Sequence, residues 1–185
     1  AAYAFARLRA PGREAIFLLV LSTMMLPAMA TMVPTFIIFA KIEWIDTFLP
    51  LTVPALFGSA FHIFLLRQFF LTIPRELEDA ALIDGSGWLG IWWKIILPLS
   101  KPALATVGVF AFTAAWNELM GPLIYLNKRS LYTLSLGLRA FSSTEGSDWG
   151  LMMAASTMMA LPIIVLFFFA QRQFVQGIAL TGLKG

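Results

Sequence analysis

The stretch LIDGSGWLGIWW carries three glycines, Gly85, Gly87 and Gly90, at the spacing G-x-G-x-x-G. This spacing is typical of the turn that binds the pyrophosphate of a dinucleotide, where a buried strand precedes the turn and an acidic residue follows about 20 residues later. The residues before these glycines, PRELEDAALID, are instead typical of a helix that begins with proline and acidic side chains. No acidic residue lies between Asp84 and Glu118. The glycines are therefore interpreted as a turn and not as a dinucleotide site.

Other residues that could do chemistry are few. The chain has no cysteine and a single histidine, His62, which lies in an apolar run beside Phe61 and Phe64. Disulfides, thiolate ligands and a cysteine nucleophile are thereby excluded, and a lone histidine does not make a metal site. The motifs G-x-S-x-G, H-E-x-x-H and G-x-x-x-x-G-K-[ST] are absent. We expect no catalytic, metal-binding or cofactor-binding residue, which argues against an intramembrane enzyme. His62 is expected to form a hydrogen bond between helices.

The composition is that of a membrane protein. Apolar residues make up 59% of the 185 residues and charged residues only 12%, whereas an average soluble domain has about 25% charged residues. The net charge of +3 is attributed to basic residues on cytoplasmic loops. A nucleic-acid partner is not expected, because no basic run interleaves with a polar surface.

Four apolar stretches are long enough to cross the hydrocarbon core of a bilayer, which takes about 20 helical residues. Lipid offers the backbone no hydrogen-bond partners, so each stretch is expected to be helical. The alternating segments of about ten residues that build a membrane barrel are absent. The sequence thus predicts an all-α, polytopic transmembrane helical bundle that forms one domain over residues 1–185. The predicted spans are residues 15–40, 49–71, 102–126 and 150–170.

Basic residues predict the orientation of the spans, since Lys and Arg gather on the cytoplasmic side. If the N-terminal residues, the segment 73–101 and the C-terminal tail share one side, that side has nine basic residues and the other has four. The segment 73–101 is therefore expected to be cytoplasmic. The nine are Arg7, Arg9, Arg13, Arg67, Arg75, Lys94, Lys101, Arg172 and Lys184, and the four are Lys41, Lys128, Arg129 and Arg139.

The segment 73–101 is too polar to span a membrane, and its pattern predicts a helix–turn–helix. A first helix is expected over residues 74–83 and a turn over 84–87, where aspartate and glycine favour turn conformations. A second, apolar helix is expected over residues 88–97, ending before Pro98. The first helix would present its acidic residues to the cytosol and the small Ala80 and Ala81 on its other side. A short acidic helix anchored by an apolar one is suited to docking a partner.

This segment, ELEDAALIDGSGWLGIWWKIILPLSKPAL, resembles the EAA loop of the permeases of binding-protein-dependent ABC importers. The family pattern is E-A-A, three residues, G, nine residues, I, one residue and L-P. The chain matches it from Asp79 to Pro98, with Asp79 in place of the usual glutamate. The stretches RQFFLTIPRELEDAALIDGSG, AAYAFARLRAPGR, WNELMGPL, LMMAAS and QRQFVQGI look most like the carbohydrate-uptake subgroup, the maltose- and glycerol-phosphate-type permeases. Such permeases usually have six spans, so we expect an N-terminally truncated chain.

The resemblance implies a permease subunit of an ATP-driven importer that moves a sugar or sugar-like solute across the cytoplasmic (inner) membrane of a prokaryote. The chain would not be an enzyme and would carry no cofactor, because ATP hydrolysis belongs to a partner. The expected partners are a cytoplasmic ABC ATPase dimer, a second homologous permease, an extracytoplasmic solute-binding protein and the lipid bilayer. The alternatives are a permease for a peptide, an amino acid or a polyol phosphate, and a membrane scaffold that transports nothing.

Two sets of site residues follow from the resemblance. In the first, which would couple the chain to the ATPase, Asp79 offers a charge, Ala80 and Ala81 allow close approach, and Gly85 permits the turn. Alternatively, Gly85 serves only the turn and the alanines serve only packing. The coupling set is Glu78, Asp79, Ala80, Ala81, Asp84, Gly85, Ile95, Leu97 and Pro98.

The second set, Trp116, Asn117 and Glu118, lies in the third predicted span. Polar groups at membrane depth usually face the bundle or a cavity. An indole and an amide suit a sugar path, so these three residues are candidates for contact with the solute. The equally weighted alternative is that Glu118 reaches the outer interface and Asn117 bonds a neighbouring helix.

Overall fold

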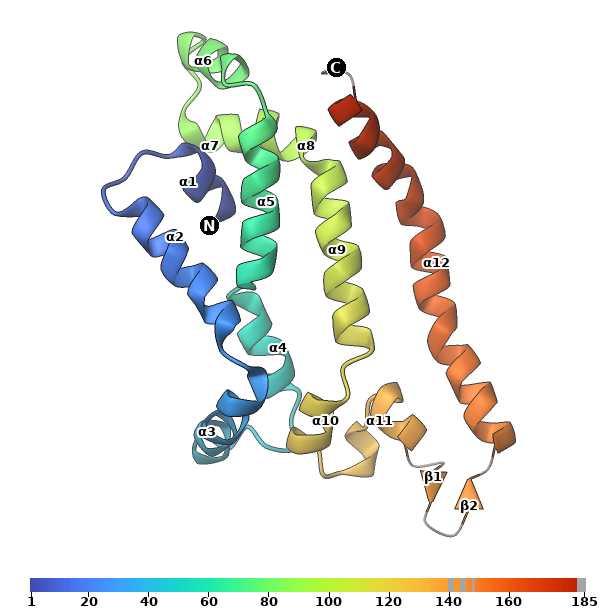
Figure 1. Cartoon of the computed structure of the whole chain (residues 1–185). Helices are drawn as coiled ribbons and strands as arrows, with labels where there is room; N and C mark the ends of the chain where they lie inside the picture. The colour runs from blue at the N-terminus through green and yellow to red at the C-terminus, as the bar shows by residue number, and fades with distance from the viewer. Residues whose placement is uncertain (140–141, 144–145, 148, 183–185) are drawn as a thin grey trace. The chain divides into compact units, whose positions relative to one another are not determined.

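The computed structural model describes the backbone of residues 1–139, 142–143, 146–147 and 149–182, and the side chains of residues 1–139 and 149–171. Arg172 and Lys184, counted above among the cytoplasmic cations, lie outside the described side chains. The described elements are helices apart from one hairpin of two strands with two residues each (Figure 1). In chain order they are α1 (Ala2–Arg7), α2 (Arg13–Ser22), the 3₁₀ helix η1 (Thr23–Met25), α3 (Ala28–Lys41), α4 (Leu49–Leu56), α5 (Ala60–Thr72), α6 (Glu76–Ile83), α7 (Trp88–Ile91), the π-helix η2 (Trp92–Ile96), α8 (Leu97–Leu99), α9 (Lys101–Trp116), α10 (Met120–Tyr125), the 3₁₀ helix η3 (Arg129–Leu131), α11 (Leu134–Arg139), β1 (Ser142–Ser143), β2 (Gly146–Ser147) and α12 (Trp149–Gly182).

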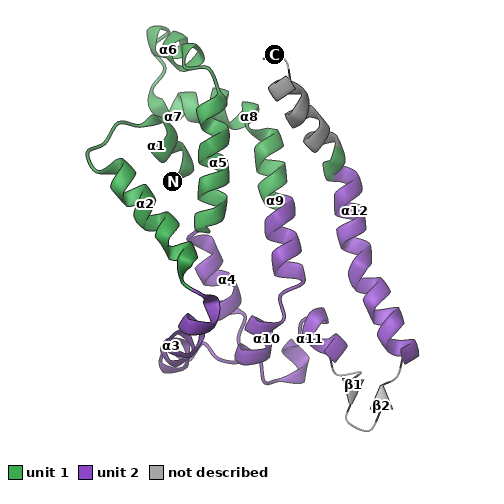
Figure 2. Cartoon of the chain, viewed as in Figure 1, with its two compact units in different colours: residues 1–26, 59–108, 170–185 green, residues 27–58, 109–169 purple. Residues whose placement is uncertain are grey.

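The helices form two compact units, coloured separately in Figure 2. Unit 1 comprises Ala1–Leu26, Ser59–Gly108 and Ala170–Gly185, and unit 2 comprises Pro27–Gly58 and Val109–Phe169. Each unit thus assembles segments that are distant in the sequence. The cytoplasmic helix–turn–helix expected from the sequence falls wholly within unit 1.

The core of unit 1 lies where α1 packs along α5 and where the α6–α8 segment joins them. Its buried residues come from four places in the sequence, and Tyr3, Ile63, Leu66, Phe69, Trp92 and Ile95 pack around them. Small side chains on α1 let that helix approach closely, and aliphatic side chains of α7 and η2 fill the centre. The buried set is Ala2, Ala6, Phe70, Ile73, Ala81, Ile91 and Ile96.

The helix–turn–helix is present, with differences at its two ends. The first helix begins at Glu76 and not at residue 74. α6 ends at Ile83, and Gly85 has the left-handed φ of +82° that the turn was expected to need. The second helix does not stop before Pro98 but continues to Leu99. The five π-helical residues of η2 lie just before this proline. A local π turn re-pairs the backbone groups that proline leaves without a partner, so the chain can stay helical.

Unit 2 is organised around the loop that joins α3 to α4. Tyr125 at the end of α10 stacks on Phe36 and meets Phe39 edge-on, with ring centroids 6.4 and 5.4 Å apart. α10 also packs closely on α4, since a Cβ atom added at Gly121 would lie 2.9 Å from a methyl carbon of Leu51. The backbone amide of Asp46 donates a hydrogen bond to the carbonyl of Tyr125 at the end of α10, and its side chain accepts one from the amide of Asn127. These contacts connect residues about 80 positions apart.

Two described helical segments are long and apolar enough to cross a membrane, Leu49–Thr72 and Trp149–Gln171. Two bent helix pairs pass the same test as broken spans: Arg13–Met25 with Ala28–Lys41, and Trp88–Leu99 with Lys101–Trp116. The first break falls at Pro27, which disfavours a helical conformation at the residue before it. Almost none of the side chains of the two continuous segments is buried within the chain, which suits helices that face lipid or other subunits.

The apolar run 102–126 contains two helices and not one. α9 ends at Trp116, and α10 begins at Met120 after three intervening residues. Pro122 follows at a position where its ring would clash with the carbonyl of Glu118 in a continuous helix. The polar residues of this run therefore lie at a helix break.

Candidate functional site

The α6–turn–α7 segment forms one end of unit 1, with α6 beyond α5 and α7 (Figure 2). Its outer surface combines carboxylates with apolar side chains. Asp79, Ala80 and Asp84 are exposed, as is Gly85 in the turn. Ile83 is 86% exposed, and Leu89, across the turn, is 82% exposed. Exposed aliphatic side chains beside carboxylates make this surface a candidate for contact with another protein.

The inner surface of α6 is different. Ala81 is buried in the core of unit 1, whereas its neighbour Ala80 is exposed, so the two alanines do not share a face as the sequence suggested. Successive residues on a helix point about 100° apart, which separates them. Glu78 is also buried, with only 5% of its surface exposed. The predicted coupling residues on α6 therefore divide into an outer set, Asp79 and Ala80, and an inner set, Glu78 and Ala81.

Glu78 is paired with Arg7 of α1. Its Oε1 atom lies 3.2 Å from Nε of Arg7, although the two groups lack the alignment of a hydrogen bond. The Arg7 guanidinium also donates a hydrogen bond to the backbone carbonyl of Ile73, just before α6. Burial raises the pKa of the Glu78 carboxyl, and the charges of Arg7 and Arg75 oppose that effect without cancelling it. The sequence did not indicate that Arg7 pairs with Glu78. It placed Arg7 only among the basic residues expected on the cytoplasmic side.

The second helix of the segment anchors it. Ile96 is fully buried, Ile95 packs against the core cluster, and Leu97 is partly buried. Pro98 is exposed. Ser100 is buried and donates a hydrogen bond of 2.6 Å to the carbonyl of Ile96, so its hydroxyl is satisfied. Ile95, Ile96 and Leu97 thus anchor the segment, and Pro98 is the most exposed residue of this stretch.

The candidate solute-contacting residues lie at the C-terminal end of α9, and each has a hydrogen bond within unit 2. The indole of Trp116 donates to the carbonyl of Met159 at 2.9 Å and its ring stacks on Phe112. Asn117 donates to the carbonyl of Thr113 at 2.9 Å, one turn back in its own helix. Glu118 accepts a hydrogen bond from the amide of Gly121 at 3.0 Å.

A cavity of about 540 Å³ lies between α9 and α12 within unit 2. Of the three candidate solute-contacting residues it includes only Asn117, and its other polar side chain is that of Thr113. The remaining lining is apolar: Val109, Phe110, Ala114, Ile163 and Phe167. The cavity provides an amide and a hydroxyl for hydrogen bonds.

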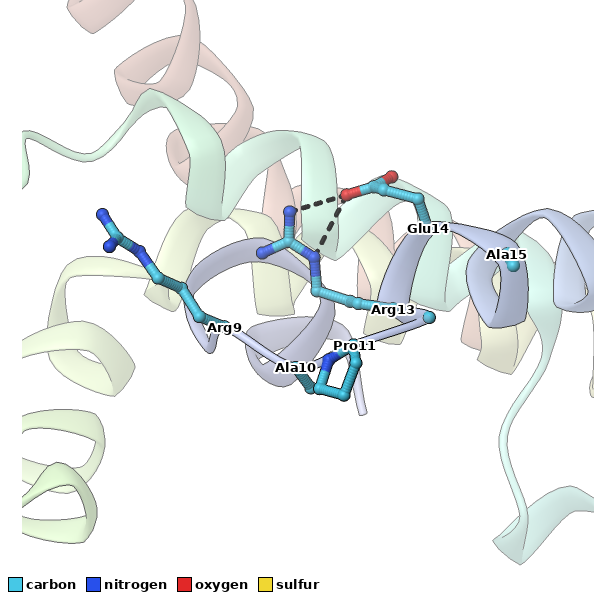
Figure 3. Close-up of a pocket in the computed structure, with 7 residues that line it drawn as sticks. Arg9, Ala10, Pro11, Arg13, Glu14 and Ala15 are labelled. Atoms are coloured by element: carbon cyan, nitrogen blue, oxygen red, sulfur yellow. Dashed lines mark hydrogen bonds and ion pairs between the residues drawn. The ribbon is translucent and has the colours of Figure 1, made fainter.

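A second cavity, of about 470 Å³, lies at the turn between α1 and α2 (Figure 3). Its polar groups are largely used within the chain. Arg13 pairs with Glu14 at 2.6 Å, and Glu14 also pairs with Arg67 of α5 at 3.1 Å. Arg67 further lies 4.2 Å from the ring centre of Phe17 and donates to the carbonyl of Phe5. Arg67 thereby connects α1, α2 and α5, which is a structural role.

Comparison with known proteins bears on this arrangement. Residues 1–180 match the family described as binding-protein-dependent transport system inner membrane component. The chain belongs to this family. Its membership confirms the resemblance seen in the sequence. The family description and the apolar helices place the chain in the inner membrane.

Curated members of this permease family are similar over nearly the whole chain. The arabinooligosaccharides transport system permease protein AraQ of Halalkalibacterium halodurans is 37% identical over 99% of the chain. The sn-glycerol-3-phosphate transport system permease protein UgpE of Yersinia pestis is 39% identical over 96% of it. The chain spans only 65% and 63% of the lengths of these two relatives.

A solved structure shows the same fold. The crystal structure of a bacterial ABC transporter involved in the import of the acidic polysaccharide alginate matches 92% of this chain, and this chain covers 65% of the matched one. The TM-score is 0.78 at 25% identity. The all-α, polytopic fold expected from the sequence is thereby confirmed. The relatives are transport permeases and not enzymes, in agreement with the expectation for this chain.

Proposed function

We propose that this chain is a permease subunit of an ATP-driven importer that moves a sugar or sugar-like solute across the cytoplasmic membrane. The solute class is supported by the relatives, which are named for the transport of arabinooligosaccharides, sn-glycerol-3-phosphate and alginate. Arabinooligosaccharides and alginate are carbohydrates, and sn-glycerol-3-phosphate is a polyol phosphate, which keeps that alternative open. ATP hydrolysis would take place in a partner ATPase.

The observation that carries the proposal is the outer surface of the α6–turn–α7 segment. A docking surface must be exposed and yet firmly attached to the helices that it moves. Asp79, Asp84, Ile83 and Leu89 are exposed, whereas Ala81 and the following apolar helix are buried in the core that contains α1 and α5. A cytoplasmic ATPase subunit with a basic and apolar cleft would fit this surface.

The other partners follow from the family. A second permease subunit would pack against the many exposed apolar side chains of the helices, and an extracytoplasmic binding protein would deliver the solute. Trp116, Asn117 and Glu118 remain candidates for the solute path. All three side chains make hydrogen bonds within unit 2. Asn117 also lines the cavity between α9 and α12, which makes it the stronger candidate for solute contact.

The experiment is co-purification from the native organism with the full-length permease tagged. We expect an ABC ATPase, a second permease and a solute-binding protein, with Asp79→Lys reducing the amount of ATPase. The ligand of the recovered binding protein then identifies the solute for uptake assays. Absence of an ATPase, or full retention by Asp79→Lys, would contradict the proposed docking surface. Retention of an ATPase without ATP-dependent solute uptake would favour the scaffold.

A further inference from the structure

Arg7 and Glu78 form the buried ion pair of unit 1. Arg7 is 7% exposed and Glu78 is 5% exposed, and they join the C-terminal end of α1 to the first turns of α6. Within the described side chains, the other ion pairs, Arg13–Glu14 and Arg67–Glu14, share a carboxylate that is more than half exposed. Among the described ion pairs of this unit, only Arg7–Glu78 has both side chains buried.

Burying such a pair does not by itself stabilise a fold, because each charge loses its hydration. Apolar residues of similar volume often do as well or better, so a buried pair is best justified by the geometry that it imposes. Here the guanidinium contacts two points at once, the carboxylate of Glu78 and the carbonyl of Ile73. These points flank the start of α6. The contacts fix both the position and the direction of that helix relative to α1.

We infer that Arg7 is a positioning residue that makes α1 and the docking helix α6 move as one body, so that displacement of α6 by the ATPase is transmitted to α1. This inference rests on the proposed docking of α6. It assigns neighbouring carboxylates to different tasks. Asp79 faces outward and binds the partner, and Glu78 faces inward and holds α6 to α1.

The surrounding packing supports this division. Ala2 and Ala6 of α1 and Ala81 of α6 belong to the same buried cluster, and small side chains allow helices to approach without locking their rotation. Apolar contacts among small groups are non-directional. The Arg7 guanidinium supplies the direction that the cluster lacks, through its hydrogen bond to the carbonyl of Ile73 and its ion pair with Glu78.

The test measures the α1–α6 distance in the assembled transporter. The chain contains no cysteine, so spin labels can be placed at Ala4→Cys on α1 and Leu77→Cys on α6, two exposed positions outside the proposed docking set. The full-length permease, with any other cysteines replaced, is purified with its partners. The distance distribution is recorded without nucleotide and with ATP plus vanadate. We expect one narrow distribution that is the same in both states.

Glu78→Gln should leave the bound ATPase at the wild-type amount, but broaden the label distribution and make it change with ATP plus vanadate. Asp79→Asn is the matched control, with the opposite expected result: an unchanged distribution and less bound ATPase. A third variant, Arg7→Met with Glu78→Leu, removes both charges while filling their volume, and it should assemble and behave as Glu78→Gln does.

Three results would overturn the inference. The wild-type distance could change between the two states. Glu78→Gln and the apolar double variant could both keep the wild-type distribution, which would show that the alanine cluster suffices. Both variants could fail to give folded permease, which would make the pair a folding requirement only. A wild-type permease that binds no ATPase would refute the proposed function instead, and the nucleotide-free distances would still show whether the pair fixes α6.

Discussion

The indole nitrogen of Trp116 donates a hydrogen bond of 2.9 Å to the backbone carbonyl of Met159 and so connects α9 to α12 within unit 2. The indole ring also stacks on Phe112, with ring centroids 5.5 Å apart. A contact of Trp116 with the solute is thereby disfavoured, because its indole nitrogen and its ring already have partners within the chain. The connection between two apolar helices is the role that the geometry supports.

Trp116→Phe is therefore expected to lower stability and to leave solute affinity unchanged. The phenyl ring can still stack on Phe112, but the bond to Met159 is lost, at a cost of about 1 kcal/mol. The thermal midpoint of the purified complex checks this prediction. Trp149→Phe is the control, and it should change the midpoint little because Trp149 is 66% exposed. A weaker apparent affinity for the solute at unchanged stability would instead place Trp116 on the solute path.

Asp46 presents a second prediction. This residue has a left-handed φ of 60°, and its Oδ1 accepts bonds from the amides of Asn127 and Lys128 at 2.5 and 3.3 Å. Asp46→Ala removes a charge-assisted acceptor and should cost about 1.5–3 kcal/mol of stability. Asp46→Asn keeps an acceptor and tolerates the left-handed conformation, so it should cost less. Equal denaturation midpoints for alanine, asparagine and wild type would show that this loop contact carries no stability.

The turn between α6 and α7 gives a third prediction. Gly85→Ala should destabilise the segment by about 1–2 kcal/mol, because an L-residue is strained at a φ of +82°. Gly87→Ala is the matched control, since Gly87 has φ of −75° and no atom lies within 4 Å of an added Cβ. Proteolysis rates within the turn report the local opening. Equal rates for the two variants would mean that the turn conformation is not required.

The titration of Glu78 gives a fourth prediction, on how stability depends on pH. Burial raises the pKa of Glu78 above its ordinary value of 4.5, with Arg7 and Arg75 opposing and Asp79 adding to the effect. The folded protein then holds this proton more tightly than the unfolded chain does. The resulting stability is fully present below the ordinary pKa and is lost as the pH rises through the raised pKa.

Glu78→Gln resembles the protonated carboxyl at every pH. The thermal midpoint of wild type relative to this variant should therefore fall as the pH rises from about 4 to neutrality. Comparing the two proteins cancels the titration of groups that they share. A difference that grows in favour of wild type over this range would mean that Arg7 outweighs burial and that the pKa is lowered.

Local chemistry explains why much of the α6–turn–α7 segment could be predicted from the sequence. The acidic start of α6, the glycine in the turn and the apolar run after it act within a few residues of one another. The end of the second helix was predicted at residue 97 and lies at Leu99, because the π-helix absorbs the effect of Pro98. That adjustment depends on packing across the segment, which a pattern of residue types does not record.

Relationships between distant residues could not be predicted. The pairing of Arg7 with Glu78 depends on α1 packing along α5, and nothing in either local pattern indicates it. The burial of Glu78 is the clearest instance, since acidic residues on a cytoplasmic helix are normally exposed. The break after Trp116 was missed because hydropathy averages over residues 102–126 and does not distinguish one helix from two.

Site-specific photocrosslinking tests the docking surface most directly. A photoreactive amino acid is placed in the full-length permease in its native membrane. The test position is Ile83 on α6, which is 86% exposed, and the control position is Phe57 at the end of α4, which is 82% exposed. We expect a crosslink from position 83 to an ATP-binding subunit and none from position 57. Efficient incorporation at position 83 with no crosslink to such a subunit would contradict the assignment of α6 as the surface that receives the ATPase.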